Sequence, residues 1–383
     1  MITRRRSTFP VVLQIVLLLL VCLPQPGDSL SSGAGSVVEI AGMHTTRANH
    51  TSTLLPDGEV LIAGGFGGSG TESHPYASAE TFDPRLGRFQ TAGSMTIGRS
   101  GHTATLLRSG KVLIVGGWIG RYDARRTAEL YDPATRKFSI TGEMVEERAG
   151  STAALLADGR VLICGGVDRN MNALSSAELY DPLTGAFAPT GAMREPHGEA
   201  HTSTVLRDGR VLITGGGSGR YPSQTIYRTA ELYDPATGKF TVTGPMIVPR
   251  HKHAAVMMSD NKVLIVGGSD NRDWRGQYSS AELYDPGTET FSPTADMSTM
   301  RFKLPDAVVL LAGGKVLVAG GGSFAEIYDP VKKTFSRTEG SFGSAHFFAS
   351  ATPLLGGQVL ITGGYFASEG RLPSAATAWI YKP

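Results

Sequence analysis

The sequence has very little cysteine, no excess of one charge sign and no pattern of helical period. Only two cysteines occur in its 383 residues, Cys22 and Cys164. Cys22 lies in an apolar N-terminal segment, so Cys164 has no partner and a disulfide cannot hold the fold together. The 49 glycines and 21 prolines instead indicate many short strands joined by tight turns.

The charge balance excludes some classes of partner. The chain has 36 basic and 34 acidic residues. Its first 29 residues contain Arg4, Arg5, Arg6 and Asp28, so the remainder has 33 residues of each sign. A neutral chain gives no reason to expect nucleic acid or an anionic membrane as a partner.

The first thirty residues differ in kind from the rest. Three arginines, Arg4 to Arg6, precede the apolar run Val11 to Leu23, which ends at Pro24 and is too short to span a bilayer comfortably. This pattern predicts a signal peptide at residues 1–29 and a secreted or periplasmic mature chain without a membrane span. An uncleaved N-terminal membrane anchor is the alternative.

The dominant pattern is Val-Leu-Ile-x-Gly-Gly, which occurs seven times with small substitutions. Its glycine pairs begin at Gly64, Gly116, Gly165, Gly215, Gly267, Gly320 and Gly363. Most intervals are close to fifty residues, the period of a propeller blade. An alternating strand and a two-residue turn such as Asp57-Gly58 precede the run, and a variable loop and two more strands follow it. Each repeat therefore predicts a blade of four antiparallel strands.

The two ends of the chain carry complementary fragments of one blade. The last repeat stops at Pro383 after its third strand, and the first begins with an isolated fourth strand within 37–43. Pairing these fragments would close the ring and remove its exposed edges. The sequence thus predicts an all-β fold in one domain, residues 36–383, with blades at about 47–95, 96–144, 145–193, 194–246, 247–297, 298–342, and 343–383 plus 36–43.

The repeat consensus resembles a known family. Gly-Gly, a variable loop and Ala-Glu-x-Tyr-Asp-Pro-x-Thr-x-x-aromatic is similar to the kelch repeat across essentially the whole mature chain, with phenylalanines such as Phe89 and Phe138 where kelch blades usually carry tryptophan. This resemblance implies a seven-bladed kelch-type β-propeller. Kelch propellers include protein-binding modules, the central domain of galactose oxidase and a bacterial sialic-acid mutarotase, so the resemblance leaves the function open.

Five blades carry an arginine just before the first strand: Arg47, Arg99, Arg148, Arg250 and Arg301. This segment and the loop after the second strand emerge on the same face of a four-stranded meander, called here the long-loop face. The guanidinium groups could ring the channel mouth and bind an anion. The alternative is structural ion pairs with the Ala-Glu glutamates Glu80, Glu129, Glu178, Glu231, Glu282 and Glu326. The fourth repeat has an extra residue and His197 or Gly198 in the arginine position, and the seventh has His346.

The histidines invite a metal hypothesis, which their spacing does not favour. His50, His102, His201 and His253 begin the first strands of four different blades, and one residue per blade is not a ligand spacing. We predict no metal site and no cofactor. The copper centre of galactose oxidase would also require a cysteine crosslinked to a tyrosine, whereas Cys164 lies within an apolar Val-Leu-Ile run.

The variable loops after the second strands combine aromatic residues with arginines: Trp118, Arg121, Tyr122, Arg220, Tyr221, Arg272, Trp274 and Tyr365. Such residues suit a protein interface or an acidic sugar, and the alternative is that they pack the loops together. We predict an exported, non-catalytic module that binds an unknown protein or glycan through the long-loop face. The alternative is an enzyme acting on an anionic sugar, such as a mutarotase or epimerase, with an arginine holding the carboxylate and His197 moving protons.

Overall fold

The computed structural model describes residues 33–68, 74–120, 123–220, 223–366 and 372–383, all within the second of the chain's two units, Ser32–Pro383. The predicted signal peptide therefore lies outside the described residues. Among the residues described, no helix is long and apolar enough to cross a membrane.

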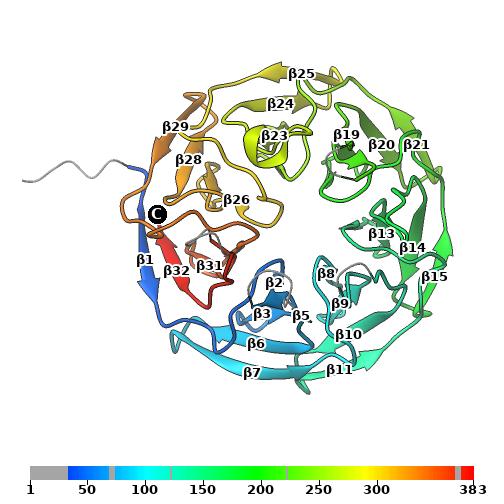
Figure 1. Cartoon of the computed structure of the whole chain (residues 1–383), viewed down its shortest axis with the longest axis horizontal. Coiled ribbons are helices and arrows are strands. Elements are labelled where there is room, and N and C mark those ends of the chain that lie inside the picture. The colour runs from blue at the N-terminus through cyan, green and yellow to red at the C-terminus, as the bar shows by residue number, and fades with distance from the viewer. Residues whose placement is uncertain (1–32, 69–73, 121–122, 221–222, 367–371) are drawn as a thin grey trace, which may run out of the picture. The chain divides into compact units, whose positions relative to one another are not determined.

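Seven four-stranded antiparallel sheets make up the unit, and Figure 1 shows them arranged around a common centre. The first three are β2 (Thr51–Leu54), β3 (Val60–Ala63), β6 (Ser78–Asp83) and β7 (Arg88–Ser94); β8 (Thr103–Leu106), β9 (Val112–Val115), β10 (Ala128–Asp132) and β11 (Lys137–Ile140); and β12 (Thr152–Leu155), β13 (Val161–Cys164), β14 (Ala177–Asp181) and β15 (Ala186–Pro189). Each sheet follows the order in which its strands occur along the chain.

The next three sheets repeat this order, and in the last sheet the fourth strand comes from the N-terminal end of the chain. These four sheets are β16 (Thr202–Val205), β17 (Val211–Thr214), β20 (Ala230–Asp234) and β21 (Lys239–Val242); β22 (Ala254–Met257), β23 (Val263–Val266), β24 (Ala281–Asp285) and β25 (Thr290–Pro293); β26 (Val308–Leu310), β27 (Val316–Val318), β28 (Glu326–Asp329) and β29 (Thr334–Arg337); and β30 (Ser350–Pro353), β31 (Val359–Thr362), β32 (Ala378–Lys382) and β1 (Ser36–Ile40). The first strand of each sheet lies nearest the centre and contacts the first strands of both neighbours.

The second strands form the core because both of their faces are covered by other blades. In β3 every residue is buried. Val60 and Ile62 pack with Leu360 of the seventh blade, whereas Leu61 and Ala63 pack with β9 of the second. Alternate side chains of one strand thus join two blade interfaces, which explains why this run is continuously apolar.

The predicted closure of the ring is confirmed. β1 pairs with β32 in antiparallel register, from Ser36 opposite Lys382 to Ile40 opposite Ala378. The last sheet is therefore built from both ends of the chain, and the fold is the predicted seven-bladed propeller. No open sheet edge is left between the first and last blades, which favours a closed and cooperative ring.

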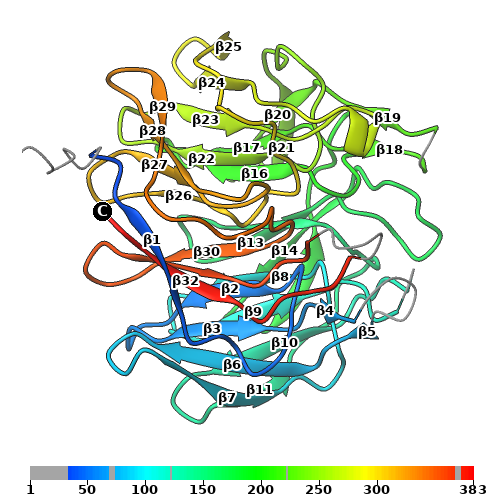
Figure 2. The ribbon, with the colours of Figure 1, turned by 60° about the vertical axis from the view of Figure 1, so that its left-hand side comes forward.

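Additional short elements decorate the long-loop face. They are the ribbons β4 (Phe66–Gly67) with β5 (His74–Pro75) and β18 (Gly217–Ser218) with β19 (Thr225–Ile226), and the 3-10 helix η2 (Asp273–Arg275). Figure 2 shows both ribbons on the same side of the propeller, opposite the C-terminal end of β32. The variable loops of different blades therefore surround one end of the central channel.

Candidate functional site

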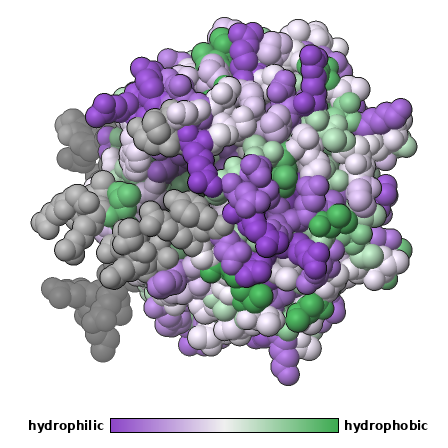
Figure 3. Space-filling model, turned by 45° about the vertical axis from the view of Figure 1, so that its right-hand side comes forward, coloured by the Kyte–Doolittle hydropathy of each residue, from purple (hydrophilic) through white to green (hydrophobic). Residues whose placement is uncertain are grey.

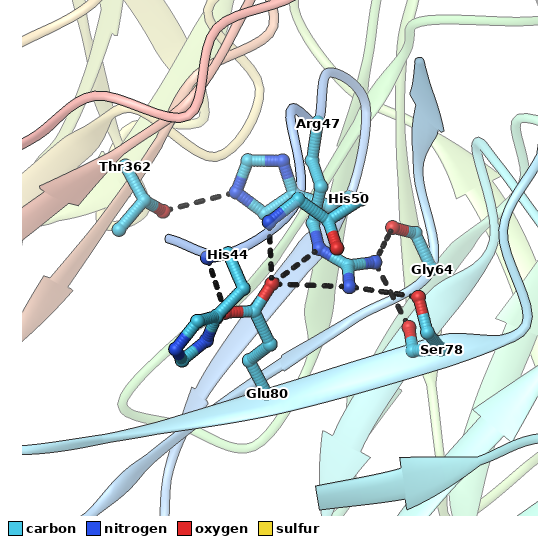
Figure 4. Close-up of polar contacts among 8 residues, drawn as sticks. His44, Arg47, His50, Gly64, Ser78, Glu80 and Thr362 are labelled. Carbon is cyan, nitrogen blue, oxygen red and sulfur yellow. Dashed lines mark hydrogen bonds and ion pairs between the residues drawn. The ribbon is translucent and has the colours of Figure 1, made fainter. Parts of the chain in front are cut away.

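On the long-loop face, a buried arginine meets a buried glutamate within the same blade. In the first blade, Arg47 Nε and Nη2 donate to Glu80 Oε1 at 3.4 and 3.3 Å (Figure 4). Arg47 Nη1 donates to the carbonyl oxygens of Gly64 and Ser78 at 2.8 and 2.9 Å. Glu80 also accepts a hydrogen bond from the backbone N–H of His44 at 2.8 Å. The guanidinium group thus ties the Gly-Gly run to the third strand.

Four further blades repeat this arrangement. The N···O distances lie between 2.8 and 3.1 Å in the pairs Arg99–Glu129, Arg148–Glu178, Arg250–Glu282 and Arg301–Glu326. All five arginines are 0–1% exposed, and each also donates to the carbonyl of the first glycine of its Gly-Gly pair. They form structural ion pairs rather than an open ring of guanidinium groups. A ligand could reach them only if the pairs opened.

Histidine occupies the arginine position in the other two blades. His197 Nδ1 contacts the carbonyl oxygen of Gly215 at 2.5 Å, and its Nε2 lies 3.4 Å from Glu231. His346 Nδ1 contacts the carbonyl oxygen of Gly363 at 2.9 Å. Every first glycine of the seven pairs therefore has a basic side chain on its carbonyl. His197 is 0% exposed, which leaves it no direct path to a ligand in this structure.

The histidines of the first strands link neighbouring blades. The Nε2 atoms of His50, His102, His201 and His253 lie 2.9–3.0 Å from threonine hydroxyls of the preceding blade in the ring, at Thr362, Thr51, Thr152 and Thr214. Burial lowers the pKa of His50, His102 and His201 to about 3, so these rings are neutral. In the described part of the chain, no three His, Cys, Asp or Glu side chains converge on a position that could hold a metal.

A ring of left-handed backbone conformations surrounds the channel mouth. One residue per blade has φ between 53° and 65°, two residues before the first strand in six blades and five residues before β26 in the sixth: Asn49, Gly101, Gly150, Ala200, Lys252, Lys303 and Phe348. The backbone N–H of each donates to the carbonyl of its counterpart in the preceding blade at 2.8–3.2 Å, in six of the seven steps. The missing step is from Ala200 to Gly150. The extra residue of the fourth repeat, Glu199, lies at this break.

A cavity of about 290 Å³ begins at this ring and continues along the first strands. Its wall includes the polar residues Thr51, Ser52, Thr103, Thr152, Thr202 and Ser203. Its charged residues are Glu199, Lys252 and Asp306. A second, smaller cavity of about 70 Å³ shares Glu199 and Lys252 and extends under β18 and β19. Of the arginines predicted as ligand-binding residues, none of those that the structure describes lines either cavity.

The predicted loop residues divide into buried and exposed groups. Trp118 is 9% exposed and donates from Nε1 to Glu199 Oε1 at 2.8 Å, and Tyr365 is 5% exposed within an aromatic cluster. These two pack the loops, as the alternative interpretation expected. Trp274 is 40% exposed, and Arg220 and Arg272 are also exposed, Arg272 pairing with Asp270 at 2.6 Å. Arg121, Tyr122 and Tyr221 lie outside the described residues.

One functional group that the sequence did not reveal is Lys303, which is 6% exposed and enclosed by aromatic rings. Its Nζ lies 4.1 Å from the ring centre of Trp274, 4.8 Å from that of Phe302 and 5.1 Å from that of Tyr365, whose hydroxyl accepts its hydrogen bond. Aromatic faces attract an ammonium group. Burial is the largest influence on the pKa of Lys303, followed by the positive charge of Lys252. Together they lower this pKa to about 7.

This lysine should make the stability of the propeller depend on pH. Above pH 7 the folded chain releases the Lys303 proton, whereas the unfolded chain keeps it up to the ordinary lysine pKa of about 10.4. Stability should therefore rise with pH in this window, by up to about 1.4 kcal/mol per pH unit. Urea unfolding of the native chain and of Lys303→Met between pH 7 and 9 would measure this slope.

The slope should be lost in Lys303→Met and kept in Lys262→Met, which removes a partly exposed lysine at the turn between β22 and β23. Equal slopes in the native chain and Lys303→Met would show that this ammonium group titrates as an ordinary lysine.

The comparisons with known proteins agree with this geometry. Residues 101–322, more than half of the chain, match the family described as the KLHDC2/KLHL20/DRC7 Kelch-repeats domain. The chain belongs to the Kelch-repeat family. A second match is the spermatocyte protein spe-26 of Caenorhabditis elegans, 32% identical over 129 residues. That segment is 33% of this Kelch propeller and 21% of the worm protein, so it spans about a fifth of the relative's length.

A solved structure shares the fold. A fungal alcohol oxidase of the AA5 family, in complex with copper, superposes on this Kelch propeller with a TM-score of 0.69 and 15% identity, covering 91% of this chain and 76% of the oxidase. At this identity the likeness concerns the fold alone.

The described residues of this Kelch propeller do not fit the copper centre described for galactose oxidase. Cys164 is fully buried in β13, where its sulfur contacts Thr152 Oγ1 at 3.4 Å and burial raises its thiol pKa to about 11. It therefore belongs to the core rather than to the channel mouth. The described residues also contain no converging set of three metal ligands of the His, Cys, Asp or Glu types.

Proposed function

We propose that this Kelch propeller is an exported, non-catalytic binding module that holds a glycan, or another small hydroxyl-rich ligand, at the channel mouth on the long-loop face. The observation that carries the proposal is the cavity of about 290 Å³ at the centre of this face. Its volume is at the lower end of the range for ligand pockets, which suits one sugar unit.

The chemistry of the cavity wall supports a polar ligand. Serine and threonine side chains of the first strands alternate with small residues such as Ala104, Ala153 and Ala255, and backbone from the ring lies at the rim. Hydroxyl groups donate and accept hydrogen bonds, so they can satisfy the hydroxyls of a sugar, while alanine leaves room for its ring. Because the wall combines several blades, no single repeat carries the site.

Part of the outer surface of the propeller is also polar. Figure 3 shows hydrophilic side chains over much of one side of the propeller, with hydrophobic side chains in small, separate spots among the coloured residues. A broad apolar patch would favour a large protein interface. The protein partner remains a second prediction, supported by the partly exposed Trp274 beside the mouth.

The residues proposed for the enzyme alternative are not accessible to a substrate in this structure. This alternative required an arginine of the channel mouth to hold a carboxylate and His197 to move protons, yet these side chains are 0–1% exposed and occupied by glutamate and carbonyl oxygens. General acid–base catalysis needs the catalytic group within hydrogen-bond reach of the substrate. The binding function is therefore the one that the accessible residues favour.

Filling the cavity should abolish ligand binding. Ala153 lines the cavity from β12, and Ala153→Trp would place an indole in the space for a sugar ring. Saturation-transfer NMR of the mature chain with a panel of neutral, acidic and amino monosaccharides would identify a ligand, and calorimetry would measure its affinity. We expect Ala153→Trp to weaken that affinity by at least about a hundredfold, a free-energy change of roughly 3 kcal/mol.

The matched control is Ala186→Trp, which adds the same side chain at an exposed position of β15, the outermost strand of the same blade. This variant should bind as the native chain does. Absence of binding by every sugar of the panel to the native chain, or equal binding by Ala153→Trp, would refute the channel mouth as the site.

A further inference from the structure

The break in the backbone ring places a charged side chain, that of Glu199, at the wall of the cavity. At Gly150 an added Cβ would lie 2.7 Å from Cγ of Glu199, so the side chain of this extra residue packs over the glycine. Trp118 Nε1 holds Glu199 Oε1 at 2.8 Å. The carboxylate is thereby fixed at the rim of the cavity, and the bond from Ala200 to Gly150 that would complete the ring is replaced by a charged side chain.

A second carboxylate lines the same cavity. Asp306 follows Pro305 in the segment that leads into β26, and no described residue donates a hydrogen bond to its carboxyl group. Asp306 is exposed by surface area, yet the protein atoms around it reduce the solvation of its carboxyl group and raise its pKa to about 6, so it is ionised at neutral pH. Reduced solvation also raises the pKa of Glu199, which is likewise exposed by surface area, against the bond from Trp118 and the charge of Lys252. A positive charge close to these carboxyl groups would therefore stabilise the ionised form of both.

The other titratable groups of the wall offset these carboxylates only in part, through the charge of Lys252 on Glu199. Lys252 Nζ lies 2.6 Å from Asp273 Oδ1, which already balances its charge. His102 and His201 are neutral at physiological pH because burial lowers their pKa to about 3. The cavity wall thus has a net negative charge although the whole chain is nearly neutral.

We propose that the ligand of the channel mouth is an amino sugar whose protonated amine is bound by Glu199 and Asp306. This inference rests on the proposed function and adds that the ligand carries a positive charge. An ammonium group donates three hydrogen bonds, and a charge-assisted bond to a carboxylate is about twice as strong as a neutral one. The hydroxyl-rich wall would then contact the remainder of the sugar.

Calorimetry with three matched sugars tests this charge preference. Glucosamine carries the amine, N-acetylglucosamine has it blocked as an amide, and glucose has a hydroxyl in its place. At pH 7 we expect glucosamine to bind about tenfold or more tightly than either neutral sugar. Glu199→Gln and Asp306→Asn should each remove most of this preference. Glu199→Gln retains an oxygen that can accept the Trp118 hydrogen bond, so the loop should keep its packing.

The control variant is Asp260→Asn, which removes an exposed carboxylate from the turn between β22 and β23. It should leave all three affinities unchanged. Glucosamine affinity of the native chain should also fall as the pH is lowered through about 6, because Asp306 then gains a proton, and Asp306→Asn should flatten this dependence.

The outcomes separate the two proposals. If the three sugars bind equally and Glu199→Gln and Asp306→Asn bind like the native chain, while Ala153→Trp still abolishes binding, the amine inference is overturned and the binding site stands. If no sugar of the panel binds the native chain, both are overturned. A preference for glucosamine that Asp260→Asn reduces as much as Glu199→Gln does would assign the effect to overall charge and would also overturn the inference.

Discussion

Replacing Arg148 with methionine is expected to lower the free energy of unfolding by about 3–5 kcal/mol, because Glu178 would keep a buried charge without its partner. Arg148 donates to Glu178 Oε1 at 3.1 Å and to the carbonyl oxygens of Gly165 and Ser176 at 3.1 and 3.0 Å. Methionine fills much of the space but donates no hydrogen bond, so two buried carbonyls would also lose a donor. Urea unfolding followed by tryptophan fluorescence would measure the loss.

Two further variants separate the charge from the packing. The double variant Arg148→Met with Glu178→Gln removes the unpaired charge and should recover part of the stability. Arg126→Met breaks the pair with Glu143, in which both side chains are about half exposed, and should cost less than about 1 kcal/mol. A loss below about 1 kcal/mol for Arg148→Met would contradict a structural role for the buried pairs.

The second large effect is expected at the Gly-Gly runs, where Gly215→Ala should destabilise the propeller by about 3 kcal/mol. Gly215 has φ of +64°, and an added Cβ would overlap the carbonyl oxygen of Arg250 and lie 2.7 Å from Cε1 of His253. Neither neighbour can move freely, because Arg250 is paired with Glu282 and His253 bonds Thr214. The substitution combines backbone strain with a clash between two blades.

Gly209→Ala isolates the backbone strain from the clash between blades. Gly209 lies in the turn between β16 and β17 of the same blade, with φ of +88° and nothing within 4 Å of an added Cβ. It should cost about 1–2 kcal/mol from the left-handed conformation alone. Thermal and urea unfolding of both variants would give the difference. Equal losses at the two sites would mean that close approach between blades contributes nothing at Gly215.

The repeat made most of the scaffold predictable. Alternation, Asp-Gly turns and Val-Leu-Ile runs are local patterns, and each of them recurs in the blade that the structure shows. The pairing of the two chain ends could also be foreseen, because each end lacks what the other supplies. The arginine–glutamate pairs were one of two interpretations. Choosing between them required burial, which depends on neighbouring loops that the consensus does not describe.

The candidate site was much less predictable, because its residues are departures from the repeat. The extra residue of the fourth blade was visible, but nothing in the sequence indicated that Glu199 would interrupt a backbone ring and receive a bond from Trp118, 81 positions away. No repeated pattern in the sequence pointed to Asp306 or Lys303 either. For Trp118 and Tyr365 the sequence left two interpretations open, a binding surface or loop packing, and both side chains are buried against residues of adjacent blades.

The sequence by itself determined a closed seven-bladed Kelch propeller, because every blade repeats the same local signals and buries its faces against copies of itself. Only the tertiary structure decided which charges are available. It enclosed the five repeated arginines in ion pairs and left Glu199, Lys252 and Asp306 on the cavity wall. The physical reason is that accessibility at the channel mouth is set jointly by seven blades, and no pattern within one repeat contains that information.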